Sequence, residues 1–132
     1  MTTSDLPAEG QPDVSTEGTE APFDDVITLS TSTGDDGVVT VTVVGEVDTF
    51  TAPVLRSTLD SQLEQQPKEL VIDLSGVQFL GSAGLAVLVE TQKSSRAKDV
   101  GLRLIATTRA VTRPLEVTGL IDLFTIADST AR

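Results

Sequence analysis

The chain has 132 residues, enough for one domain with one hydrophobic core, and a formal net charge of −11. It contains no Cys, which excludes disulfides and thiolate metal sites, and no His, which excludes Ser-His-Asp triads, Cys-His pairs and His-ligated zinc within the chain. With no Trp or Tyr and only four Phe, a nucleic-acid surface built on aromatic stacking is not expected.

The first 22 residues are polar and acidic, and we predict that they form a disordered tail ahead of a single domain over residues 23–132. Residues 1–55 contain eleven Asp and Glu and no Lys or Arg, whereas residues 56–132 contain nine of each kind. The N-terminal part therefore carries the whole excess of negative charge. A segment such as residues 1–22 cannot bury enough apolar surface to offset the entropy lost on ordering.

Charge and hydropathy together indicate where the protein works. An acidic chain without a basic patch is repelled by the phosphates of nucleic acids and of anionic lipids. The sequence has no run of about 18 apolar residues and no basic segment leading into an apolar secretory signal. We therefore expect a cytoplasmic protein that binds neither nucleic acid nor membranes.

The first elements of the domain are typical of an antiparallel hairpin. Residues 26–31 have the composition of an edge strand, and residues 34–37 contain two Gly and two Asp, as a turn does. Val39, Val41 and Val43 then alternate with threonines, which is the period of a strand with one buried face.

A helix and a buried strand follow. Asp48, Thr49 and Thr51 are candidate N-caps, and Pro53 fits only the first helical turn. Leucines at positions 55, 59 and 63 predict one buried stripe of that helix, and a proline at position 67 ends it. Residues 70–74 are apolar and of strand length, so they predict a central strand covered on both faces.

The second half of the domain alternates helices with strands. After a loop over residues 75–80, we predict a helix from near Ser82 to about residue 97, a strand over 102–106, a short helix over 110–118 and a last strand over 123–126. Pro114 predicts that the short helix is broken or starts late, and Gly119 ends it. The order β-β-α-β-α-β-α-β predicts an α/β fold, with a mixed, mostly parallel sheet of four to five strands and helices packed on it.

Ser82 is the residue with the most chemistry to explain. As the start of a helix it could be only an N-cap, which contributes about 1 kcal/mol. An esterase nucleophile is excluded, because Leu80 stands where that motif needs glycine and the chain has no His to act as base. The segment also lacks the lysine of a P-loop. A phosphate on Ser82 would be tolerated by the positive end of the helix, but it would disrupt a partner docked there.

Residues 83–89 are seven consecutive non-polar positions, more than one helix face can hold. Either both sides of this helix are buried inside the domain, or part of it is exposed to a partner. The periodicity leaves both open.

Three motifs resemble the signature of STAS-domain anti-anti-sigma factors (anti-sigma factor antagonists). Residues 73–85, DLSGVQFLGSAGL, resemble the family segment that precedes its central helix; residues 45–48, GEVD, and residues 118–120, TGL, followed by Phe124, resemble its other two motifs. The resemblance covers about residues 25–128 and implies the STAS fold.

The resemblance also implies a mechanism. It implies that Ser82 is phosphorylated by an anti-sigma factor that is also a serine kinase, that only the unphosphorylated chain binds this partner and frees a sigma factor, and that a phosphatase resets the chain. The protein is then a ligand and a substrate, not an enzyme, with no cofactor and no metal, and it is a monomer or a weak dimer. The partner-binding residues expected from it are Glu46, Asp48, Thr49, Leu80, Gly81, Ala83, Gly84, Leu85 and Val87.

Two residues depart from the family pattern. Many members have Asp immediately before the serine and a second serine after it, where this chain has Gly81 and Ala83. Ser82 is thus the only candidate phosphoserine of the loop, and it lacks the usual acidic neighbour. A different class of function stays open: a constitutive accessory STAS subunit of a larger assembly, stressosome-like or lipid-transporting, in which Ser82 is only a helix cap.

Overall fold

The computed structural model describes residues 27–127, so the predicted N-terminal tail and the predicted start of the domain lie outside the described residues. Helices and strands follow one another in the predicted order. They are β1 (Ile27–Thr33), β2 (Val38–Val47), α1 (Ala52–Glu64), β3 (Glu69–Leu80), α2 (Ser82–Ala97), β4 (Gly101–Ile105), α3 (Arg109–Val117), the 3₁₀ helix η2 (Leu120–Leu123) and β5 (Thr125–Ala127).

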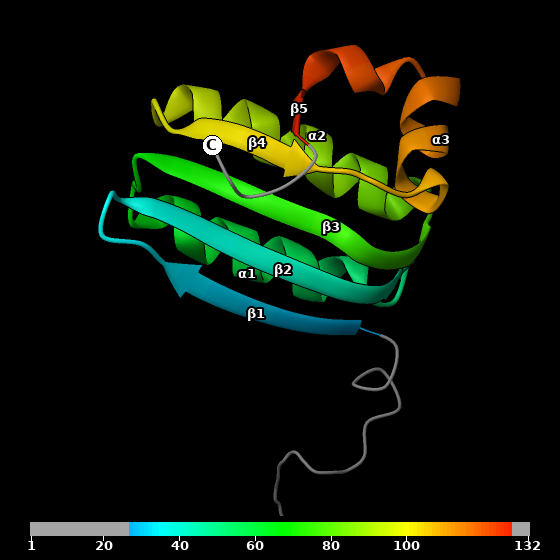
Figure 1. Ribbon diagram of the computed structural model, residues 1–132, viewed down its shortest axis with the longest axis horizontal. Coiled ribbons are helices and arrows are strands. Elements are labelled where there is room, and N and C mark those ends of the chain that lie inside the picture. The colour runs from blue at the N-terminus through cyan, green and yellow to red at the C-terminus, as the bar shows by residue number, and fades with distance from the viewer. Residues whose placement is uncertain (1–26, 128–132) are drawn as a thin grey trace, which may run out of the picture.

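The five strands form one mixed sheet in the order β1-β2-β3-β4-β5, which confirms the predicted α/β architecture. Strands β1 and β2 pair antiparallel as a hairpin, and the other neighbours pair parallel. Figure 1 shows α1 and α2 side by side on one face of the sheet, with α3 at the end where β4 finishes. The crossovers from β2 to β3 and from β3 to β4 thus return along the same face.

The main core lies between the sheet and these helices. The register pairs Val41 with Ile72 and Ile72 with Leu104, so alternate residues of β2, β3 and β4 face the same side. All three side chains are completely buried. The predicted leucine stripe of α1 is confirmed, since its three leucines and Leu88 of α2 are also 0% exposed.

Strand β3 is longer than predicted, because residues 75–80 are not a loop. They continue the pairing with β2 through two irregularities in register, which end in the pairs Glu46–Phe79 and Val47–Leu80. Gly45 has a φ of 114°, a conformation that favours glycine and lets β2 bulge there. The six residues were not recognised as strand because a bulged pair does not keep the simple alternation of an ideal strand.

The C-terminal elements correct two further predictions. Helix α3 continues through Pro114, because Val111 and Leu115 on either side of it are fully buried and hold the helix in the core despite the hydrogen bond that a proline cannot donate. The last strand begins at Thr125 rather than at Leu123, which belongs to η2. No helix within residues 27–127 is long and apolar enough to cross a membrane.

Candidate functional site

The candidate site lies where β2 and β3 end together. The backbone N–H of Gly81 donates to the carbonyl of Val47 over 2.9 Å, so the chain after β2 and the chain after β3 leave the sheet side by side. In α/β sheets the carboxyl ends of parallel strands are the usual place for a binding site. A hollow of about 220 Å³ opens there, and its lining residues are Asp48, Thr49, Phe79, Gly81, Ser82 and Ala83.

Ser82 is the first residue of α2, as predicted, and not its N-cap, so the alternative role of a simple cap does not apply. The N-cap is Gly81, whose extended backbone places its carbonyl to accept the N–H of Leu85 over 3.1 Å. Ser82 is exposed, and its hydroxyl makes no hydrogen bond to any residue in the described part of the chain. No side chain caps this helix end. The hydroxyl is therefore accessible to a modifying partner, next to first-turn N–H groups that favour negative charge.

Asp48 shapes the neighbouring turn through its carboxylate. One oxygen, Oδ1, accepts the backbone N–H of Phe50 over 2.9 Å and that of Thr51 over 3.0 Å. The hydrogen bond from the Thr51 N–H lowers the pKa of Asp48 most. Desolvation opposes it, and the Phe50 N–H and the Thr51 hydroxyl add to the lowering, so the pKa stays below its ordinary value. Asp48 therefore stays ionised beside Ser82 at neutral pH.

Thr51 occupies the N-cap position of α1, but its hydroxyl serves the turn instead of the helix. The hydroxyl accepts the N–H of Asp48 and donates to the carbonyl of Glu46, both over 2.9 Å, and the residue is completely buried. Asp48 and Thr51 thus exchange hydrogen bonds within a rigid turn. This turn holds Glu46, Asp48 and Thr49 in place at the edge of the hollow.

The predicted partner-binding residues divide into surface and core. Glu46 and Thr49 are exposed, and Asp48, Gly81 and Ala83 are partly exposed. The other four are buried in the core and so do not form part of the exposed surface at this site: Leu80, Gly84, Leu85 and Val87. The apolar run of α2 is explained mainly by internal packing.

Gly84 has a packing role that its place in the motif did not reveal. A Cβ at this position would lie 2.6 Å from Val47 Cγ1 and 2.7 Å from Leu80 Cδ1. Both distances are too short for real carbon contacts. Glycine therefore lets the start of α2, and Ser82 with it, lie directly against the ends of β2 and β3.

Two phenylalanines at this edge were missed by the sequence analysis. Phe79 is 51% exposed and lines the hollow, and Phe50 is 68% exposed and follows Thr49 in the chain. No pattern in the sequence singled out Phe79, because residues 75–80 were predicted to be a loop. Gln78 and Phe79 are both exposed, so this stretch does not keep the alternation of an ideal strand.

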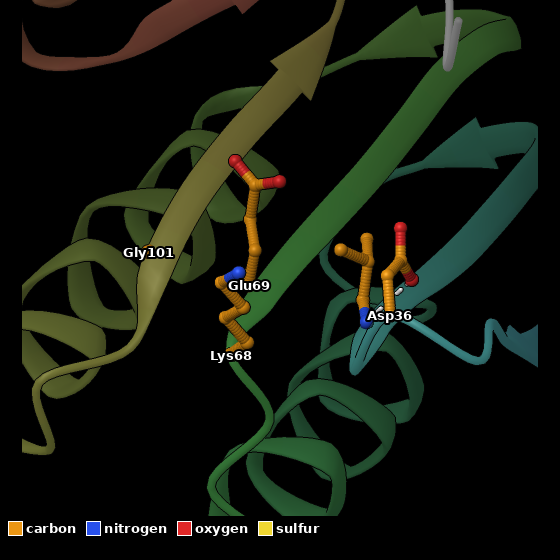
Figure 2. Close-up of a pocket in the computed structure, with 5 residues that line it drawn as sticks. Asp36, Lys68, Glu69 and Gly101 are labelled. Carbon is orange, nitrogen blue, oxygen red and sulfur yellow. Dashed lines mark hydrogen bonds between the residues drawn. The ribbon is translucent and has the colours of Figure 1, made fainter. Parts of the chain in front are cut away.

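A larger hollow, of about 420 Å³, lies at the opposite end of the sheet, where the parallel strands begin. It is lined by Asp36, Val38, Lys68, Glu69 and Gly101. Figure 2 shows Lys68 and Glu69 at the start of β3 and Asp36 in the turn before β2. Asp36 accepts the N–H of Val38, and Glu69 pairs with Arg103 over 2.7 Å. These groups already serve the fold, so we do not assign a site there.

Residues 27–127 contain no group of three or more acidic side chains placed to hold a metal ion. The chemistry of the Ser82 hollow is therefore that of an exposed hydroxyl, an ionised carboxylate and an exposed aromatic ring. Such a surface can receive a phosphate and can contact a protein.

A family model, sequence relatives and a solved structure all relate this chain to STAS-domain proteins or anti-sigma factor antagonists. The sequence matches the STAS domain family over residues 30–132. It is 35% identical over 89 residues to the anti-sigma-F factor antagonist RsfB of Mycobacterium tuberculosis H37Rv, covering 67% of this chain and 72% of that protein. It is 29% identical over 99 residues to the anti-sigma-B factor antagonist of Staphylococcus aureus NCTC 8325, covering 75% of this chain and 92% of that protein. The crystal structure of an anti-sigma factor antagonist from Mycobacterium paratuberculosis superimposes with a TM-score of 0.75 at 38% identity, over 85% of this chain and 92% of that one.

Proposed function

Because this chain belongs to the STAS-domain family of anti-sigma factor antagonists, we propose that it binds an anti-sigma factor through the surface around Ser82 and thereby frees a sigma factor. Members of this family are not enzymes but act by binding. The observation that carries the proposal is the exposed Ser82 hydroxyl in a hollow shared with Asp48 and Phe79. The proposed contact surface consists of Glu46, Asp48, Thr49, Gly81, Ser82 and Ala83.

We propose further that phosphorylation of Ser82 releases the partner, which is itself a serine kinase, and that a phosphatase restores binding. A phosphate adds a charge of about −1.5 to −2 at the first residue of α2. The helix N-terminus favours this charge, so the fold accepts it. A docked partner has to desolvate it beside the ionised Asp48, and that cost falls on the complex alone.

We propose that the protein acts in the cytoplasm as a monomer or weak dimer, apart from nucleic acid and membranes. Its excess of acidic residues supports this, because negative charge disfavours contact with phosphate-bearing surfaces.

The test uses the purified serine-kinase anti-sigma factors of the source bacterium, each with ATP. We expect one of them to bind the wild-type chain and to add a single phosphate at Ser82, as located by mass spectrometry. Ser82→Ala should bind but accept no phosphate, and Ser82→Asp should lose binding. Ser61, which is exposed on α1, provides the matched control, since Ser61→Asp adds the same charge on another surface and should bind normally.

The outcomes separate the proposal from its rival. Phosphorylation of Ser82→Ala at the same stoichiometry, or normal binding by Ser82→Asp, would contradict the switch. Normal binding by Ser82→Asp together with stable co-purification in a large assembly would favour a constitutive accessory subunit. If the wild-type chain binds none of these anti-sigma factors, the whole proposal is contradicted.

A further inference from the structure

Two of the four aromatic residues of the chain are exposed near the ends of β2 and β3. The chain has four Phe and no Trp or Tyr, and Phe50 and Phe79 are 68% and 51% exposed. By contrast, Phe124 is only 8% exposed. A large apolar side chain on the surface forgoes the gain of burial, and exposed aromatic rings that gather at one site are typical of protein interfaces. Phe79 lines the Ser82 hollow, and Phe50 directly follows Thr49, which also lines it.

Gly81 explains how the Phe79 ring comes to lie beside Ser82. A Cβ at position 81 would lie 3.1 Å from Cε2 and 3.3 Å from Cζ of that ring. The backbone of Gly81, with φ −89° and ψ −179°, is extended and open to any residue. Glycine is therefore not required here for its conformational freedom. Its effect is to leave room for the Phe79 ring against the N-cap of α2.

We propose that Phe79, seated against Gly81, is the anchor side chain through which this chain holds its anti-sigma factor, entering an apolar recess on that protein. The inference rests on the proposed function, and it identifies Phe79 as the residue that supplies the binding energy for the anti-sigma factor. The surface is continuous with Ser82, since both residues line one hollow. Phe50 supplies a second, more peripheral apolar contact.

This arrangement links the anchor to the switch. Burying the ring requires water to leave the hollow, whereas a phosphate on Ser82 requires water to stay. The two demands meet within one hollow of about 220 Å³, which is smaller than typical ligand pockets and of a size suited to side chains. Phosphorylation can thus release the partner without moving a helix or a strand. Glu46 is exposed and pairs with Phe79 in the strand register, so it adds negative charge to this edge and disfavours an acidic partner.

The test measures the Kd of purified variants for the purified anti-sigma factor that binds the wild-type chain. Phe79→Ala should weaken binding by about tenfold or more, the loss expected for an interface hot spot, and Phe50→Ala by less. Val117, which is 73% exposed on α3 and does not line the hollow, provides the matched control. Val117→Ala should change the Kd by less than about twofold. Thermal unfolding of each variant checks that the fold is intact.

A second variant displaces the ring without removing it. The branched side chain of Gly81→Val fits an extended backbone but takes the space of the ring, so it should weaken binding to a similar degree. The double variant Phe79→Ala/Gly81→Val should then bind no worse than either single variant, because both remove the same contact.

The results separate this inference from the proposed function. If Ser82→Asp abolishes binding while Phe79→Ala stays within about twofold of wild type, the proposed function stands and the anchor is refuted. Additive losses in the double variant would refute the seating of the ring on Gly81. If the wild-type chain binds none of the anti-sigma factors, the proposed function fails and the anchor fails with it.

Discussion

Replacing Gly84 with alanine tests how closely α2 packs on the sheet. The added methyl group would lie 2.6 Å from Val47 Cγ1 and 2.7 Å from Leu80 Cδ1, whereas carbon atoms in contact prefer about 3.5–4.0 Å. Val47 is 0% and Leu80 4% exposed, so neither side chain can swing into solvent. The start of α2 must therefore move away from β2 and β3 by roughly 1 Å to reach that contact range.

Two opposing effects determine the size of the change. Alanine is about 1 kcal/mol more favourable than glycine within a helix. An extra methyl group in a filled core costs about 1–3 kcal/mol. Because two buried side chains are approached at once, we expect the packing cost to exceed the helical gain. The net loss should be about 1 kcal/mol, which corresponds to a Tm lower by about 4–8 °C for a domain of this size.

Urea unfolding followed by circular dichroism measures this change. Ala86→Gly, at an exposed position of the same helix, isolates helix propensity and should destabilise by about 1 kcal/mol. Val47→Ala makes room for the new methyl group, so Gly84→Ala should cost less in that background than in the wild type. If Gly84→Ala instead raises the free energy of unfolding, the close packing of α2 on the strand ends is refuted.

Three further predictions concern the turns. Thr51→Val removes the buried hydroxyl that joins the Asp48 N–H to the Glu46 carbonyl, and it should lower the free energy of unfolding by about 1–3 kcal/mol in urea titrations. The control Thr49→Val, at an exposed position, should change that free energy little. Asp48→Asn should lower the Tm at neutral pH. The Asp48 carboxylate stabilises the fold only while it is ionised, so the difference in Tm from wild type should vanish as the pH falls through the lowered pKa of Asp48. A difference in Tm that persists in acid would contradict this. Gly119→Ala should cost about 1 kcal/mol, through backbone strain at φ 76° alone, since nothing lies within 4 Å of the added Cβ; an unchanged Tm would contradict it.

Local patterns in the sequence were sufficient to predict the order of elements. The alternating valines of β2 and the leucine stripe of α1 follow the periods of a strand and a helix, and both lie in the core as expected. Helix α2 was predicted to start near Ser82 and to run to about residue 97, and it does. These predictions succeeded because periodicity depends only on near neighbours along the chain.

The chemical character of the site was also partly visible in the sequence. The absence of His and Cys excluded whole classes of chemistry, and three spaced motifs pointed to the STAS fold, which is confirmed. The assignment of Ser82 as a phosphorylation site stays a prediction. So does the choice of partner.

Tertiary structure alone decided which residues of the motifs reach the surface. Gly84, Leu85 and Val87 belong to the motif around Ser82, yet they pack into the core, whereas Phe79 is exposed at the rim of the hollow. This division depends on the bulged pairing of β2 with the second half of β3 and on how closely α2 approaches both strands. The contacts of β2 with β3 and with α2 join residues more than 30 positions apart, and no period along the chain encodes them. The sequence by itself determined the elements and the family; the packing of the strand ends decided which side chains stand beside Ser82.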